Sequence, residues 1–390
     1  MKTPLLISIL ALTCAAGCTS HTERTQAPII RELPPQSFTP TWTANLNLSD
    51  SNPATAMYVR DEQLFVYSKD HTSHVIARRG GQLQHIEKVQ TIATVAPPLL
   101  LGEQIVYPTN TTLEVFDTKG KHVRRVNLPA SMRSSGAAGV NDLVILGTDN
   151  SRGGRVVAMD LTREYDTPRW ELMTGGGVSS APVIMQGILY AASEDGGVYA
   201  VNRERTSVWP TPGGVFSTDG PILADLVIDE YGVYVASTDG KLYCLGRSDG
   251  KIRWQYFAST QLTVAPVATA DSVYQYVEGE GILAISKTEG EYNRTPKWKV
   301  GSARSFLAED KTYAYLRSKD NRVLAVERSS GNVKFKSESR FDIFGGNTSD
   351  GAIYVGKKDG TIYSLVPVLA PGKTGEMVFA PVQVNGVVSN

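Results

Sequence analysis

GVYVASTDGKLYCLGRSDGKIRWQY, residues 232–256, contains the pattern that decides the fold. An apolar run at 233–237 is followed by Asp239-Gly240, a second apolar run at 242–245, another Asp-Gly pair and a run that contains Trp254. Asp-Gly between two alternating apolar runs is a strong hairpin signal, because the tight type I′ turn needs positive φ angles that glycine adopts without strain. The stretch therefore predicts three consecutive antiparallel strands.

The same first strand and turn occur eight times along the chain, at intervals of 39 to 45 residues. The residues that close these strands are Ser68, Thr109, Thr148, Ser193, Ser237, Val277, Ser318 and Lys357. No segment longer than a turn or two has the apolar rhythm of a helix. A regular period of about 40 residues, built from strands, is typical of a β-propeller in which each repeat forms one blade.

A further strand opens each repeat, often directly after Ala-Pro or Gly-Pro, as at Ala181-Pro182 and Ala265-Pro266. Proline is tolerated there because the first residue of a strand needs no ladder donor. This strand brings the number in each repeat to four. The sequence therefore predicts an all-β fold, an eight-bladed propeller of four-stranded antiparallel blades over residues 41–370.

Large aromatic side chains recur in the last, outermost strand of the repeats. They are Trp170, Trp209, Trp254, Trp298 and, where another residue replaces the tryptophan, Phe335. Trp42 completes the series but precedes the first repeat, so we expect residues 41–48 to supply the outer strand of the eighth blade. Such a strand would close the ring without leaving a free sheet edge. All six side chains are predicted to pack between adjacent blades.

The first residues are typical of a bacterial export signal. Lys2 provides a positive charge, and residues 5–16 form a largely apolar run that is too short to span a bilayer. The run ends in Ala15-Ala16-Gly17-Cys18, which resembles a lipobox, although leucine is commoner than alanine at the first of these positions. The resemblance implies that residues 1–17 are removed and that Cys18 carries acyl chains. Because Thr19 rather than aspartate follows, it also implies an outer-membrane anchor.

Two segments that flank the repeats are predicted to lie outside the propeller. Residues 18–40 are polar, contain proline and lack periodicity, which indicates a flexible tether between the lipid and the domain. Residues 371–390 follow the last repeat and are expected to form a C-terminal tail.

Charge and composition argue against several classes of function. Lys plus Arg and Asp plus Glu are balanced at 39 each, so the chain has no basic excess to neutralise nucleic-acid phosphates. Of the three cysteines, only Cys244 lies beyond the lipobox, which predicts no internal disulfide. We recognise no metal-ligand cluster, nucleophile elbow, phosphate loop or calcium loop, and therefore expect no catalytic residue, metal or cofactor.

The repeat, Asp-Gly-x-Leu-Tyr followed by Gly-Lys-x-x-Trp, resembles the pyrroloquinoline-quinone-type propeller repeat. Residues 239–243 and 250–254 match it best, and residues 195–199 and 359–363 match its first half. With its lipobox, polar tether, length and eight repeats, the sequence resembles the BamB-type lipoproteins of the outer-membrane β-barrel assembly machinery. That resemblance implies a non-enzymatic scaffold in the periplasm, which binds the barrel-inserting subunit through loops on one face.

The resemblance also indicates where a partner would bind. The Arg- and Asp-bearing contact loops of the family fall near blades 4 and 5, which correspond here to residues 211–232. The residues of this segment do not reproduce the family's contacts one by one. Asp219, Asp225 and Asp229 are its acidic side chains that we select as candidate partner contacts.

Two other functions stay open at this point. A propeller lipoprotein of this type could instead bind another envelope protein or a carbohydrate. Quinone-dependent dehydrogenases share the repeat, but they are longer and use a calcium site, a stacked tryptophan and commonly adjacent cysteines. This chain has no Cys-Cys pair, and its tryptophans are at predicted packing positions, which argues against that activity.

Overall fold

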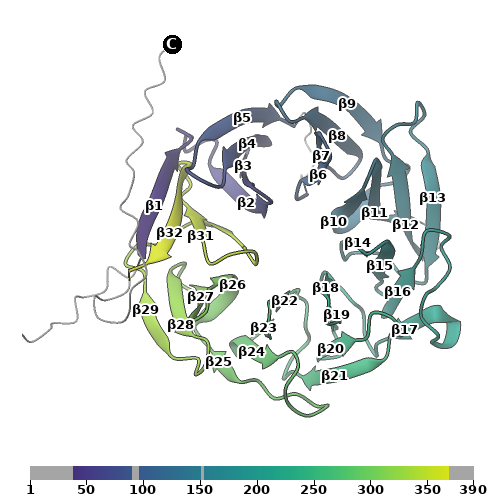
Figure 1. Ribbon diagram of the computed structural model, residues 1–390. Helices are drawn as coiled ribbons and strands as arrows, with labels where there is room; N and C mark the ends of the chain where they lie inside the picture. The colour runs from purple at the N-terminus through teal and green to yellow at the C-terminus, as the bar shows by residue number, and fades with distance from the viewer. Residues whose placement is uncertain (1–37, 90–95, 151–152, 369–390) are drawn as a thin grey trace, which may run out of the picture. The chain divides into compact units, whose positions relative to one another are not determined.

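The computed structural model describes residues 38–89, 96–150 and 153–368. These residues form eight separate four-stranded antiparallel sheets, which follow one another around a common axis (Figure 1). The predicted eight-bladed propeller is therefore confirmed. The predicted signal peptide, Cys18, most of the tether and the C-terminal tail lie outside the described residues.

We number the blades in chain order and give their strands from the innermost to the outermost. Blades 1 to 4 are formed by β2 (Ala54–Arg60), β3 (Gln63–Ser68), β4 (Thr72–Ala77) and β5 (Leu83–Lys88); β6 (Leu99–Leu101), β7 (Gln104–Pro108), β8 (Thr112–Asp117) and β9 (His122–Asn127); β10 (Met132–Val140), β11 (Leu143–Asn150), β12 (Gly153–Asp160) and β13 (Pro168–Thr174); and β14 (Val183–Met185), β15 (Ile188–Ala192), β16 (Gly197–Val201) and β17 (Val215–Ser217). Blades 5 to 8 are formed by β18 (Val227–Ile228), β19 (Val233–Ala236), β20 (Lys241–Leu245) and β21 (Ile252–Phe257); β22 (Val267–Ala268), β23 (Ser272–Val277), β24 (Gly281–Ser286) and β25 (Trp298–Val300); β26 (Ala303–Glu309), β27 (Tyr313–Ser318), β28 (Val323–Glu327) and β29 (Val333–Lys336); and β30 (Ile343–Gly345), β31 (Ile353–Gly356), β32 (Thr361–Pro367) and β1 (Phe38–Asn45).

The ring is closed by β1, the first described strand of the chain. It pairs antiparallel with β32 near the other end (Figure 1). In the register of this pair, Trp42 lies opposite Ser364. The predicted closure by an N-terminal outer strand is confirmed. The strand begins at Phe38, earlier than residue 41, so the last residues assigned to the tether belong to blade 8.

Hairpin turns and interblade packing explain why the repeat produces this fold. Gly240, in the Asp-Gly turn between β19 and β20, has a φ of 81°, which L side chains rarely adopt. The largest core cluster joins Tyr234 and Trp254 of blade 5 to Val273 and Leu283 of blade 6. Each blade buries its apolar faces against its neighbours, so the ring holds its loops in fixed positions.

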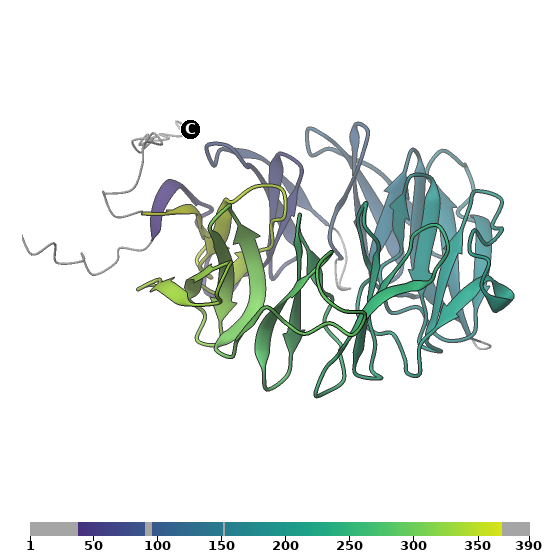
Figure 2. The same ribbon diagram turned by 60° about the horizontal axis from the view of Figure 1, so that its bottom comes forward.

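The antiparallel order gives the propeller two loop-bearing faces (Figure 2). We call face A the side on which loops join the first strand to the second and the third to the fourth. Face B bears the loops that join the second strand to the third and those that connect successive blades. Any partner that approaches along the axis meets one of these two loop sets.

Candidate interaction surface

Four tryptophans form the same hydrogen bond between adjacent blades. In each case the indole Nε1–H donates to the backbone carbonyl of a basic residue that follows the third strand of the next blade. The pairs are Trp42 to Arg78 at 3.1 Å, Trp209 to Arg247 at 2.7 Å, Trp254 to Lys287 at 2.9 Å and Trp298 to Arg328 at 2.8 Å. We call this pairing of a tryptophan with a basic residue the interblade latch.

The basic side chain of each latch contacts the blade that carries the tryptophan. Three of them form ion pairs with an aspartate in the loop after the first strand of that blade, namely Arg78 with Asp350 at 2.7 Å, Lys287 with Asp229 at 2.6 Å and Arg328 with Asp271 at 2.6 Å. The fourth, Arg247, donates to Gln186 in the corresponding loop. A tyrosine of the second strand packs against each tryptophan ring, as Tyr234 does against Trp254 at 6.0 Å. Each latch therefore ties two blades together on face A.

A glycine in the turn after the third strand receives the tryptophan of the preceding blade. A Cβ on Gly250 would lie 2.6 Å from Trp209, and one on Gly331 would lie 2.5 Å from Trp298. These distances are too short for any side chain. The glycine of the Gly-x-x-x-Trp pattern thus serves the neighbouring blade as well as its own turn.

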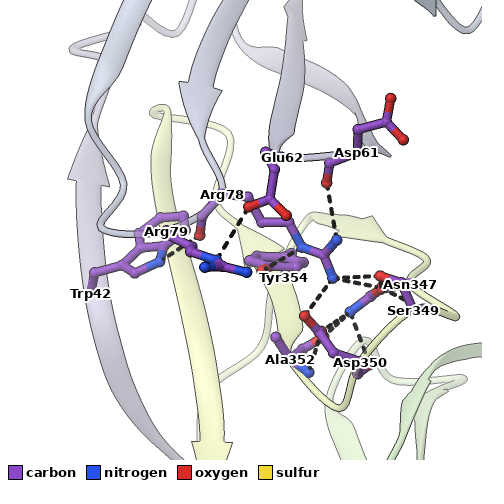
Figure 3. Close-up of polar contacts among 10 residues, drawn as sticks. All are labelled: Trp42, Asp61, Glu62, Arg78, Arg79, Asn347, Ser349, Asp350, Ala352 and Tyr354. Carbon is purple, nitrogen blue, oxygen red and sulfur yellow. Dashed lines mark hydrogen bonds and ion pairs between the residues drawn. The ribbon is translucent and has the colours of Figure 1, made fainter.

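The latch between blades 8 and 1 is the most heavily bonded (Figure 3). Arg78 donates to the Tyr354 hydroxyl at 3.0 Å, to Asn347 at 3.0 Å and to Ser349 at 2.7 Å, and its guanidinium lies over the Tyr354 ring. Burial alone would raise the pKa of Asp350, but the hydrogen bond from Asn347 and the charge of Arg78 lower it. Sequence reasoning placed Trp42 here but missed Arg78, because arginine on a strand end is usually a solvated residue.

One latch tryptophan lies outside its predicted strand, and two predicted packing residues form no latch. Trp209 is buried but precedes β17, so it is not in an outer strand as predicted. Phe335 is in β29 and packs against Tyr313, but it has no N–H to donate. Trp170 is in β13 yet only half-buried, and among the described residues no acceptor faces its Nε1–H.

Blades 1 and 2 meet at a buried carboxyl instead of a latch. Glu87 is 1% exposed and accepts a hydrogen bond from the Tyr107 hydroxyl, while its other oxygen lies 3.1 Å from His85 Nε2 without hydrogen-bond alignment. Burial raises the pKa of Glu87 to about 7. Burial also lowers the pKa of His85, so this histidine gives little charge compensation.

We therefore expect Glu87→Gln to remove a pH dependence of stability. In the unfolded chain Glu87 releases its proton near pH 4.5, whereas in the folded protein it keeps the proton up to about pH 7. Between these values the folded state binds more protons, so the free energy of unfolding falls as the pH rises, by about 3 kcal/mol in total. Urea unfolding should show that the free energy of unfolding of the wild type is lower at pH 8 than at pH 5, and that the variant lacks this difference. Glu62→Gln, at an exposed glutamate, is the control, and equal losses in all three proteins would contradict the prediction.

The three candidate aspartates do not lie together. Asp219 and Asp225 are in the loop that connects blades 4 and 5 on face B, whereas Asp229 follows β18 on face A. Asp229 accepts hydrogen bonds from the Tyr231 and Gly232 amides and takes part in the latch with Lys287. Its carboxylate is therefore occupied within the propeller.

The two aspartates on face B differ in what they contact. Asp219 is exposed and pairs with Lys241 at 2.8 Å, and the hydrogen bond from this lysine lowers its pKa. Asp225 is half-buried and accepts from the Ala181 amide at 2.8 Å and from the Ser135 hydroxyl. Asp225 therefore connects the inner ends of blades 3, 4 and 5.

Exposed apolar side chains accompany these aspartates on face B. Leu223 is in the same loop and is 40% exposed, and Val264, in the corresponding loop before blade 6, is 44% exposed. Asp219, Leu223, Asp225 and Val264 define what we call the face B patch. Sequence reasoning selected its acidic members but missed Leu223 and Val264, because their exposure depends on how the loops fold.

Three further observations concern metal ligands, the free thiol and membrane-spanning helices. Residues 38–89, 96–150 and 153–368 contain no group of three or more His, Cys, Asp or Glu side chains that could hold a metal ion. Cys244 is buried, and burial raises the pKa of its thiol to about 12. Within these same ranges, helices long and apolar enough to cross a membrane are absent.

Comparisons with known proteins agree with this architecture. No curated protein sequence matches the chain. The crystal structure of BamB from Moraxella catarrhalis superposes with a TM-score of 0.62 at 16% identity, over 84% of this chain and 97% of that one. The computationally designed Ika8 protein gives 0.60 at 14% identity, over 83% and 100%. At these identities the two structures establish the fold alone.

The sequence comparison with protein families is more specific. Residues 109–337, more than half of the chain, match the family model described as outer membrane protein assembly factor BamB. The match runs from the second blade to the outer strand of the seventh. The chain is therefore a member of this BamB family of pyrroloquinoline-quinone-type propellers.

Proposed function

We propose that the protein is a non-enzymatic scaffold that supports the assembly and insertion of β-barrel proteins into the outer membrane. Its family membership supports this role. The observation that carries it is the face B patch, where Leu223 and Val264 are exposed on two successive interblade loops and acidic Asp219 shares the first of these loops. Apolar side chains within a polar rim are typical of protein-binding surfaces. The partner would be the barrel-inserting subunit of the assembly machinery.

The experiment is co-purification from crosslinked membranes. Wild-type protein should recover the barrel-inserting subunit, and Leu223→Asp should reduce that recovery about tenfold or more, since a charge in the centre of a contact costs at least about 1.4 kcal/mol. Ile86→Asp, at an exposed residue of the outer strand β5, is the matched control and should bind normally. Recovery of other envelope proteins alone would mean that the proposed partner is wrong.

The location that we propose is the periplasmic face of the outer membrane, with Cys18 as the lipid attachment point. Lipidation would tether the propeller through the segment that precedes β1. Cys18→Ala should move the protein from the membrane pellet to the soluble periplasmic fraction, which immunoblotting of the fractions measures. Unchanged fractionation would contradict the anchor but would leave the proposed partner unaffected.

A further inference from the structure

A cleft of about 710 Å³ opens on face A between blades 3 and 4. Its lining comes from the loops after the first and third strands of both blades. The polar rim includes Asn141, Asp142, Trp170 and Arg203. The apolar wall includes Ile145, Ile184 and Leu189. The volume lies within the range of small-molecule sites, which combine an apolar lining with a few polar groups.

The cleft occupies the place where an interblade latch would be. Trp170 lies opposite Ala158 in the sheet, as Trp254 lies opposite Cys244 and Trp298 opposite Ala284. Arg203 follows Ala200 of the third strand by three residues, as Arg247 follows Cys244 in the next blade. Asp142 is in the loop that provides the aspartate in three of the four latches. The chain thus supplies all three latch groups at this junction.

These groups nevertheless do not contact one another. Arg203, Asp142 and Asn141 are exposed, and the structure gives their side chains no partner within residues 38–89, 96–150 and 153–368. Nor does any described carbonyl accept from the Trp170 indole. The Ile145 side chain explains the opening. Ile145 lies opposite Ala158 of the third strand, at the position where the latched blades have a tyrosine, such as Tyr234 opposite Cys244.

The loss of that tyrosine also argues against a cation as the occupant. In the closing latch the guanidinium of Arg78 lies 5.6 Å from the Tyr354 ring centroid and donates to its hydroxyl. Ile145 offers neither a ring nor a hydroxyl. Arg203 lies at the rim of the cleft and stays exposed. The cleft therefore no longer holds the group for which the other junctions are built.

We propose that this cleft binds a saccharide. The free groups at its rim include both an acceptor, Asp142, and donors, the Trp170 indole and the Arg203 guanidinium. A sugar hydroxyl serves both kinds of group, because it can donate and accept at once. The apolar face of a sugar ring fits against Ile145 and Ile184 and the indole. The site is on face A, away from the face B patch, so it does not depend on the proposed partner.

The test follows the indole signals of the full-length protein labelled with ¹⁵N-tryptophan. Five tryptophans give five indole signals, and the signal that disappears in Trp170→Phe is assigned to Trp170. Maltose, cellobiose and chitobiose are titrated to about 50 mM, a concentration that detects even weak binding in the millimolar range. At least one of them should shift the Trp170 signal in a saturable way. The four latched indoles, whose N–H groups already have acceptors, should not move.

Two variants and one control define the site. Asp142→Ala should weaken the binding about tenfold through the lost hydrogen bond to a charged group. Ile145→Tyr should fill the cleft and abolish the shift. Glu230→Ala, at an exposed residue of face A beside the next latch, should leave it unchanged.

Three results would overturn the proposal. The first is no shift of the Trp170 signal with any of the three disaccharides. The second is an equal shift of all five signals. The third is a saturable response to ethylguanidinium but to no sugar, which would assign the cleft to a cationic side chain.

Discussion

Trp254→Ala is expected to lower the free energy of unfolding by about 4 kcal/mol. The side chain is fully buried between blades 5 and 6 and packs against Tyr234. The Arg294 guanidinium lies 5.7 Å from the centroid of the Trp254 ring, and the indole Nε1–H donates to the Lys287 carbonyl. Truncation to alanine leaves a cavity at a junction that cannot collapse, because both blades are held in the ring. Urea unfolding followed by circular dichroism measures the loss.

Two further variants separate packing from hydrogen bonding. Trp254→Phe keeps most of the ring volume and loses the donor to the Lys287 carbonyl, so we expect a cost of about 1–2 kcal/mol. Trp170→Ala removes a half-buried tryptophan with no acceptor and should cost about 2 kcal/mol, less than the truncation of a fully buried tryptophan. If Trp170→Ala costs as much as Trp254→Ala, the latch adds nothing to interblade stability.

The sequence predicted the repeat and the closure well because both depend on short-range signals. Asp-Gly turns such as Asp239-Gly240 define some of the blades locally, and the regular spacing of the strands marks all eight. Trp42 could be assigned to blade 8 because the same residue type recurs at one place in four successive repeats. The position of this strand beside β32 then follows from the need to remove a free edge.

The functional residues were harder to predict because they depend on contacts between blades. The spacing identified Trp170 as a member of the tryptophan series, but it could not reveal that Ile145 leaves the junction open. The aspartates of residues 211–232 were grouped because they are close in sequence. The short strand β18 (Val227–Ile228) runs between Asp225 and Asp229 and carries the chain from face B to face A. This separates the candidates.

Arg78→Ala is expected to lower the free energy of unfolding by about 3 kcal/mol, because it leaves a set of polar groups without their common partner. The Arg78 side chain is 8% exposed, whereas Asp350 is 55% exposed and can be rehydrated. We therefore expect a loss at the low end for a broken buried pair. Arg79→Ala is the matched control, since its side chain is 89% exposed and its pair with Glu62 should contribute less than about 1 kcal/mol.

The position of Arg78 makes its loss specific to ring closure. Its contacts reach residues 347–354, which belong to the C-terminal part of blade 8, while its backbone carbonyl accepts from Trp42 on the N-terminal strand. One residue of blade 1 therefore holds both ends of the described chain at the closing junction. Hydrogen exchange should become faster at the β30 and β31 amides in Arg78→Ala, with the amides of blade 5 unchanged. Uniform acceleration in all blades would show that the variant weakens the whole ring and not its closure.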